Sequence, residues 1–146
     1  MASDKATLNI AAKALIINDK NEVLLARESS SHPTNTQAGL YQVIGGRIEP
    51  EETFIEGLKR EVMEETGLQV EPLYPVQIGE WWPKIKGVSH HIVAIFMACK
   101  IIGGQLALSD EHDDYQWFDL EKLNNLPVME PDKSIISSYL KSRISR

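Results

Sequence analysis

The feature that most constrains the fold is residues 53–68, TFIEGLKREVMEETGL, which have the pattern of an amphipathic helix with defined ends. Thr53 can cap the N-terminus, and Glu56, three residues later, completes a capping box. Gly67 is typical of the residue at which a helix stops. We therefore predict a helix over residues 53–66, with an apolar stripe formed by Phe54, Ile55, Leu58 and Val62.

The last two turns of this helix concentrate negative charge. Glu61 lies three and four residues before Glu64 and Glu65, so the carboxylates share one face, and each like-charge pair costs about 0.2 to 0.5 kcal/mol. Glu64 and Glu65 also lie in the final turn, where negative charge opposes the helix dipole at a cost of about 0.3 to 1 kcal/mol. A solvated acidic surface would account for such a run, but a cation bound over this face would account for it better.

A divalent cation has the required chemistry. Mg²⁺ prefers six oxygen ligands and is typically held by a few carboxylates, while phosphate oxygens and water complete the octahedron. Gly45 and Gly46 precede the helix, which indicates a backbone that can approach a metal ion and phosphates closely. Arg60, four residues before Glu64, can pair with the carboxylates and hold their rotamers, although a simple surface ion pair is the alternative.

Gly57 is unusual inside this helix, because a glycine there costs about 1 kcal/mol relative to alanine. Two explanations are open. The missing side chain leaves space for metal and pyrophosphate, or it allows close packing against a neighbouring loop.

Composition excludes several classes of protein. A formal net charge of -6 argues against a general binder of nucleic acid polymers or membranes, because both are anionic. No apolar run approaches the roughly 18 residues of a membrane span, and the first residues lack the pattern of a secretory signal. The single cysteine, Cys99, lies in an apolar run, so we expect a buried, inert thiol and a cytoplasmic location. A chain of 146 residues is expected to form one domain, residues 1–146.

Apolar runs separated by polar turns predict a sheet. Residues 8–18 and 22–28 are predicted to form a hairpin, followed by a polar loop over 29–39 and a short strand over 40–46 that turns at Gly45 and Gly46. Further strands are expected at 75–82 and 88–103, antiparallel to each other, and at 115–120. A terminal helix over 132–144 would pack Ile135, Ile136, Tyr139 and Leu140 on the sheet. The expected fold class is α/β, with helices flanking a mixed sheet.

The predicted helix belongs to a longer segment, residues 46–68, GRIEPEETFIEGLKREVMEETGL, that resembles the signature of the Nudix hydrolases, the MutT-like family. That signature is Gly, five residues, Glu, seven residues, Arg-Glu-aliphatic, any residue, Glu-Glu, any residue, Gly-aliphatic. A chance match in a chain of this length is on the order of one in a million. The fixed positions are filled by Gly46, Glu52, Arg60, Glu61, Val62, Glu64, Glu65, Gly67 and Leu68.

The resemblance implies an α/β/α sandwich with a mixed central sheet and a loop-helix-loop motif. It also implies hydrolysis of a nucleoside diphosphate linked to another group, by attack of water on a pyrophosphate phosphorus with Mg²⁺ or Mn²⁺ as cofactor. The substrate would be a small molecule: a nucleoside triphosphate, dinucleoside polyphosphate, ADP-ribose or nucleotide sugar. By the same resemblance the metal ligands are Glu61, Glu64, Glu65 and a backbone oxygen of Gly46, with Arg60 orienting the glutamates and Glu52 supporting the loop.

Many members of the family use an additional glutamate from a downstream loop, as metal ligand or general base. Glu111, six residues before Trp117, has a spacing similar to that of the family. The same loop also contains Asp110, Asp113 and Asp114, so a solvated acidic turn is the alternative. The general base is therefore expected to be Glu61 or Glu111.

The substrate is less constrained than the chemistry. Tyr41, Trp81 and Trp82 can stack on a base, although adjacent residues of a strand face opposite ways and one of the tryptophans is expected in the core. Relatives commonly have tryptophan at the position of Tyr41 and proline at the position of Ile44, a departure that leaves the metal site unchanged. The side chains that can reach phosphates are Arg27, Arg47, Lys84 and Lys86, beside the backbone of Gly45.

Two features point to different substrates. Pro83 is typical of ADP-ribose-cleaving relatives, whereas the segment EHDDYQW is similar to dinucleoside polyphosphate and nucleoside triphosphate hydrolases. His90 and His91 lie in a predicted strand and are expected to be structural.

The same fold also occurs in binding or regulatory modules and in isomerases. A catalytically silent nucleotide-binding or regulatory module would show a broken Glu-Glu pair, but Glu64 and Glu65 are both present. An isomerase would need a catalytic cysteine near the site, whereas Cys99 lies far along the chain. A homodimer is an open expectation, since dimers are common in the family.

Divalent metal should raise the melting temperature of this protein, because an ion that binds only the folded state stabilises it. Glu64→Gln or Glu65→Gln should weaken that rise by removing a ligand charge. Thermal denaturation with and without Mg²⁺ or Mn²⁺ measures both effects. An equal rise in the unsubstituted protein and both variants would place the metal elsewhere.

Overall fold

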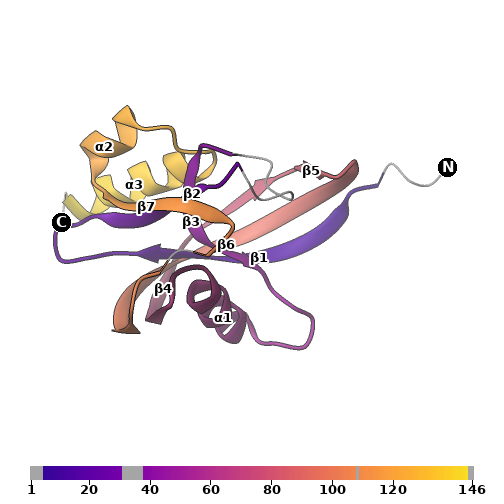
Figure 1. Cartoon of the computed structure of the whole chain (residues 1–146), viewed down its shortest axis with the longest axis horizontal. Helices are drawn as coiled ribbons and strands as arrows, with labels where there is room; N and C mark the ends of the chain where they lie inside the picture. The colour runs from indigo at the N-terminus through magenta and orange to yellow at the C-terminus, as the bar shows by residue number, and fades with distance from the viewer. Residues whose placement is uncertain (1–4, 31–37, 108, 145–146) are drawn as a thin grey trace.

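In the described part of the chain, seven strands form one mixed sheet with helices on both of its faces (Figure 1). The computed structural model describes residues 5–30, 38–107 and 109–144. In chain order the elements are β1 (Thr7–Ile16), β2 (Val23–Glu28), β3 (Tyr41–Arg47), α1 (Phe54–Thr66), β4 (Leu68–Trp81), β5 (Lys84–Ile85), β6 (Val88–Gly104), β7 (His112–Phe118), α2 (Leu120–Asn125) and α3 (Asp132–Ile144). α1 covers one face of the sheet, and α2 and α3 lie on the other. The predicted α/β sandwich is confirmed.

The strand order is β4-β6-β1-β3-β2-β7, with β5 paired to the free end of β6. β1 runs parallel to β6 and antiparallel to β3, and the other ladders are antiparallel. β3 pairs through residues 44–47 with β1 and through residues 41–43 with β2. It therefore joins the two halves of the sheet.

The predicted hairpin of the first two strands is wrong, although both strands exist. A turn does reverse the chain, with the amide of Asn18 donating to the carbonyl of Glu22 at 3.1 Å. Beyond the isolated bridge between Ile17 and Val23, however, β1 and β2 diverge, and β3 inserts between them. β3, which is distant in sequence from the turn, therefore occupies the position beside β1 that the turn had suggested for β2.

The predicted turn at Gly45 and Gly46 is also wrong, because β3 continues through both residues. Gly45 pairs with Lys13, and Gly46 pairs with Ala12. Gly45 has φ 143°, and a Cβ atom built there would lie 2.1 Å from the carbonyl oxygen of Ala12. The glycine serves a close strand approach, not a reversal. Residues 31–37 of the predicted 29–39 loop lie outside the described residues.

α1 begins and ends as predicted. The backbone N–H of Glu56 donates to Thr53 Oγ1 at 3.1 Å, and the N–H of Thr53 donates to Glu56 Oε1 at 2.7 Å, which completes the capping box. Gly67 is left-handed with φ 75°, and its N–H bonds to the carbonyl of Met63 at 2.9 Å. These caps fix the register of the acidic face relative to the sheet.

The apolar stripe of α1 is narrower than predicted. Leu58 and Val62 are fully buried, and Phe54 packs at the edge of the same core. Ile55 is exposed, because Phe54 supplies the packing of the first turn and Ile55 lies about 100° further round the helix. For Gly57 the structure favours close packing: a Cβ atom there would meet Ile48 Cδ1 at 2.4 Å.

The other predicted elements are largely confirmed. β4 and β6 are antiparallel, although β4 begins at Leu68, and β7 begins at His112. The short helix α2 was not expected. Cys99 is buried and free, and burial raises the pKa of its thiol to about 12. No helix in the described part of the chain is long and apolar enough to cross a membrane.

α3 covers residues 132–144 as predicted, with its four predicted apolar residues buried. Its first residue, Asp132, is completely buried, and Oδ2 accepts a hydrogen bond from the backbone N–H of Val43 at 2.8 Å. Oδ1 has no hydrogen-bond partner among the described residues. Burial raises the pKa of this carboxyl, against the opposing charge of Lys13. The same contact attaches α3 to the centre of β3.

Asp132→Asn should change how stability depends on pH. Because the carboxyl has a raised pKa in the folded protein, its contribution is fully present below the ordinary pKa of 3.8 and is lost as pH rises through the folded pKa. The variant has no such loss, so its melting temperature relative to the unsubstituted protein should increase from pH 4 toward pH 7. Parallel melting curves across this range would contradict the prediction.

Candidate functional site

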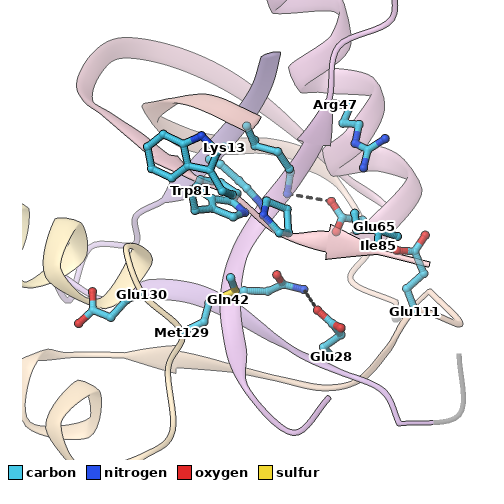
Figure 2. A pocket seen from close by; sticks show the side chains of 14 residues that line it. Lys13, Glu28, Gln42, Arg47, Glu65, Trp81, Ile85, Glu111, Met129 and Glu130 are labelled. Carbon is cyan, nitrogen blue, oxygen red and sulfur yellow. Dashed lines mark hydrogen bonds between the residues drawn. The ribbon is translucent and has the colours of Figure 1, made fainter. Parts of the chain in front are cut away.

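A cavity of about 420 Å³ opens on the α3 face of the sheet, where its two halves meet (Figure 2). It is lined by side chains from β1, β3, β4, the end of α1 and the loop before β7. Its charged lining residues are Lys13, Glu28, Arg47, Glu65, Glu111 and Glu130, and its aromatic ones are Trp81 and Trp82. Acidic, basic and aromatic groups from distant parts of the sequence therefore share one space.

Arg60 holds the acidic face of α1 together. Its guanidinium makes two bonds to Glu52, at 2.9 Å to Oε2 and 2.7 Å to Oε1. Nη1 also contacts Glu61 Oε1 at 3.1 Å and Glu64 Oε2 at 3.2 Å, and Nη2 donates to the carbonyl of Arg47 at 3.1 Å. Arg60 and the N–H of Glu49 lower the pKa of Glu52 to about 2. The contacts expected of Arg60 and Glu52 are present, and their part in metal binding stays a prediction.

Glu61 lies directly against Gly46. A Cβ atom on that glycine would fall 2.6 Å from Glu61 Oε2 and 2.8 Å from Oε1, so only glycine leaves room for the carboxylate. Burial raises the pKa of Glu61, and the charge of Arg60 opposes this shift. Glu64, by contrast, has a largely exposed side chain. The backbone of β3 and the helix α1 are thus in contact at the carboxylate of Glu61.

Glu65 is the most deeply buried of the three glutamates. Its Oε2 accepts a hydrogen bond from the N–H of Gly45 at 2.8 Å, and Oε1 lies 3.6 Å from Nε2 of buried His112 (Figure 2 shows Glu65 beside the strand). Burial raises the pKa of Glu65 to about 8, while the charge of Lys13 opposes the increase. The ionised form of Glu65 is stable in this buried position only if positive charge compensates it.

These residues fit a divalent cation in their chemistry. Carboxylate oxygens and a backbone carbonyl are the ligands that Mg²⁺ and Mn²⁺ prefer, and Gly46 leaves a space that a side chain would close. Within the described ranges, however, no three acidic, histidine or cysteine side chains are already arranged as a metal cluster. Arg60 instead occupies the position between Glu61 and Glu64 and partly satisfies their charge. The helix is therefore less strained without metal than its sequence suggested.

Glu111 reaches the cavity from the loop before β7, as its spacing suggested. The neighbouring acids are engaged elsewhere: Asp113 pairs with Arg27 at 2.6 Å, and Asp114 accepts a hydrogen bond from the hydroxyl of Tyr41. Asp110 is not part of the lining. Glu111 is thus the acid of this loop that faces the same space as Glu65.

The predicted substrate-binding residues divide into two groups. Gly45, Arg47, Trp81 and Trp82 line the cavity. Arg27, Tyr41, Lys84 and Lys86 do not belong to the lining. Tyr41 is buried and packs edge-on against Phe118, so its role here is in the core.

The two tryptophans differ, as their adjacency implied. Trp81 is partly buried, with its ring 5.8 Å from Lys13 Nζ. Trp82 is 64% exposed and stacks on His91 at 4.6 Å between ring centroids. His91 also pairs with Glu80 at 2.8 Å, which agrees with a structural histidine.

Four polar residues of this region were not expected from the sequence: Lys13, Glu28, Gln42 and His112. Gln42 Nε2 donates to Glu28 Oε2 at 3.2 Å, and His112 Nδ1 lies 3.2 Å from Ser109 Oγ. Of these four, only Lys13 could have been noticed in the sequence, as a single charge in the middle of an apolar run. Its position in the cavity lining follows from the tertiary structure.

Gly46→Ala should weaken metal binding, because the new Cβ atom would displace the carboxylate of Glu61. We expect the affinity for Mn²⁺ to fall about 10-fold or more, as for disturbed supporting contacts of metal ligands. Gly103→Ala is the matched control, since its Cβ atom would meet the flexible end of Gln69 on another part of the sheet. Isothermal titration with Mn²⁺ compares the two variants, and equal affinities would contradict the prediction.

Comparisons with known proteins agree with this geometry. The family model described as NUDIX domain matches residues 7–139. An ADP-ribose pyrophosphatase of Methanocaldococcus jannaschii is 32% identical over 127 residues, which cover 86% of this chain and 70% of that protein. An NAD-capped RNA hydrolase NudC of Stutzerimonas stutzeri is 30% identical over 90% of this chain, but this chain spans only 45% of the NudC protein.

Solved structures show the same fold. The crystal structure of a MutT protein from Methanosarcina mazei Go1 superimposes with a TM-score of 0.81 and 28% sequence identity, covering 99% of this chain and 100% of that one. The family model, the sequence relatives and the solved structures all agree. This chain therefore belongs to the NUDIX domain family and is a Nudix pyrophosphohydrolase.

Proposed function

We propose that this Nudix hydrolase uses Mg²⁺ or Mn²⁺ to cleave the pyrophosphate bond of a small nucleoside diphosphate derivative. The observation that carries the proposal is the meeting of Glu65, from α1, and Glu111, from a loop 46 residues later, in one cavity beside the Gly45–Gly46 backbone. Carboxylates from separate elements, an open backbone and cationic side chains are the groups that metal-assisted phosphate hydrolysis requires. We place this activity in a single domain, residues 1–146.

The metal would be held by Glu61, Glu64, Glu65, Glu111 and the carbonyl of Gly46. Bound there, Mg²⁺ or Mn²⁺ supplies a water of lowered pKa and stabilises negative charge on the phosphate oxygens. Arg60 keeps Glu61 and Glu64 on one side of the helix, and Glu52 fixes Arg60 through its two hydrogen bonds. The N–H of Gly45 fixes the orientation of Glu65.

The attacking water must give up a proton to a carboxylate, for which Glu61 and Glu111 are the two candidates. We favour Glu111. Glu61 contacts Arg60 at 3.1 Å and lies directly against Gly46, so its carboxylate is held in place and has little freedom to approach a water molecule. Glu111 is exposed in the cavity and can approach a water molecule there.

Arg47, Trp81 and Trp82 would bind the substrate. Arg47 is an exposed cation at the cavity and suits a phosphate, whereas the exposed ring of Trp82 suits stacking on a base. Relatives of this chain include an ADP-ribose pyrophosphatase, an NAD-capped RNA hydrolase and an 8-oxo-dGDP phosphatase. Net charge of -6 favours a small molecule over an RNA polymer or a membrane as the partner of this chain. A cytoplasmic location and a possible homodimer belong to the same proposal.

The proposal is tested on a panel of nucleotide sugars, dinucleotides, ADP-ribose and nucleoside triphosphates with Mg²⁺ or Mn²⁺. Release of nucleotide or phosphate is measured for the unsubstituted protein, Glu64→Gln and the control Glu71→Gln. Glu64 is largely exposed, so its substitution spares the core, and Glu71 is an exposed glutamate of β4. We expect Glu64→Gln to lower kcat/KM about 100-fold, since a ligand should matter at least as much as its supporting contacts.

The alternative is a catalytically silent nucleotide-binding or regulatory module. It predicts binding without turnover. Failure to release product from any substrate of the panel, with Glu64→Gln behaving like the unsubstituted protein, would favour that alternative and end the proposal of hydrolysis.

A further inference from the structure

Lys13 is a buried cation that the proposed mechanism does not use. It lies near the middle of β1, between Ala12 and Ala14, which pack in the core under α1. Its own side chain points to the opposite face, that of Ala11 and Leu15, and lines the cavity. Only 7% of its surface is exposed. A strand with no other charged residue thus places one ammonium group at the site.

The ammonium of Lys13 has no hydrogen-bonded partner among the described residues. It makes no ion pair or hydrogen bond with any of the residues that the structure describes, and its Nζ lies 5.8 Å from the centroid of the Trp81 ring. Its charge acts through space on the carboxyls of Glu65, Asp132 and Glu61. A buried charge without a hydrogen-bonded partner is unfavourable, so an anion in the cavity would satisfy it.

The position of Lys13 identifies the part of the ligand that it meets. In the close-up, Lys13 lies between Trp81 on one side and Glu65 on the other (Figure 2). A substrate with its scissile phosphates at the acidic end and its base near the indoles passes this ammonium along the way. The group of a nucleotide that is anionic at that point is the diphosphate.

We propose that Lys13 binds a phosphate oxygen of the substrate diphosphate and is a determinant of nucleotide affinity. The inference rests on the proposed function, which it extends with a residue outside the signature segment 46–68. The ammonium donates a charge-assisted hydrogen bond to the phosphate, while Trp81 retains the lysine in the cavity by a cation–π contact. The structural alternative is that Lys13 only neutralises Glu65.

Binding of ADP and inorganic pyrophosphate tests this role without any turnover. Isothermal titration is done in EDTA and again with Mg²⁺, on the unsubstituted protein, Lys13→Met and Lys13→Arg. Met keeps the length and removes the charge, so Kd for both probes should rise about 10- to 100-fold, the usual effect of losing a hydrogen bond to a charged group. Lys13→Arg should retain most of the affinity. Lys100→Met, an exposed lysine of β6, is the matched control and should bind as the unsubstituted protein does.

Metal titration separates the two roles of Lys13. Removing a cation near Glu65 should leave Mn²⁺ affinity equal or increase it, while the affinity for pyrophosphate falls. If Lys13 only neutralises Glu65, pyrophosphate affinity will be unchanged, and this result overturns the inference. The inference is also overturned if the unsubstituted protein binds neither ADP nor pyrophosphate.

A measurement on the unsubstituted protein covers the case in which Lys13→Met does not fold. The side-chain NMR resonance of Lys13 should shift when pyrophosphate is added, and a resonance that does not move overturns the inference. Failure of the two proposals can be distinguished. Lys13-dependent pyrophosphate binding without hydrolysis of any substrate removes the proposed function alone, whereas hydrolysis that Lys13→Met leaves unchanged removes this inference alone.

Discussion

Carboxylates at the edge of an apolar core are stable only where positive charge or backbone N–H groups compensate them, and the structure depends on this requirement. α1 places Glu61 and Glu65 against the sheet. Arg60 compensates the first, and the N–H of Gly45 bonds the second, with Lys13 nearby. Each compensating group comes from an element that also builds the core. The contacts that allow the fold are therefore the contacts that shape the site.

β3 is the element through which fold and site are connected. Because its first half pairs with β2 and its second half with β1, it brings the two halves of the sheet together at Gly45 and Gly46. Both glycines lie where a side chain would collide, with β1 in one case and with Glu61 in the other. The cavity forms at this junction, and the loop before β7, a strand of the far half, places Glu111 in its lining.

The structure changes one part of the metal hypothesis, namely what compensates the glutamates when no metal is bound. From sequence, three like charges on one helix face indicated a cation from solution, and Arg60 was expected only to pair with the carboxylates and hold their rotamers. The structure shows that Arg60 contacts Glu61 and Glu64, so both carboxylates have a partner in the protein itself. Metal binding would then require a redistribution of these contacts. Glu65, which Arg60 does not contact, is compensated by the N–H of Gly45 and the charge of Lys13 and lies 3.6 Å from Nε2 of His112.

The sequence by itself determined α1 with both caps and α3, and it located most of the strands, because capping and periodicity act over a few residues. The signature spacing placed Glu61, Glu64 and Glu65 on one helix face, and their part in the reaction stays a prediction. It did not determine that β3 separates β1 from β2, that Gly45 and Gly46 continue a strand, or that Tyr41 belongs to the core while Trp82 is exposed. Lys13 is the sharpest example: local pattern shows only a charge in an apolar strand. Its meaning depends on Glu65, Trp81 and Asp132, which lie 52 or more residues away in the chain and meet it only through long-range packing.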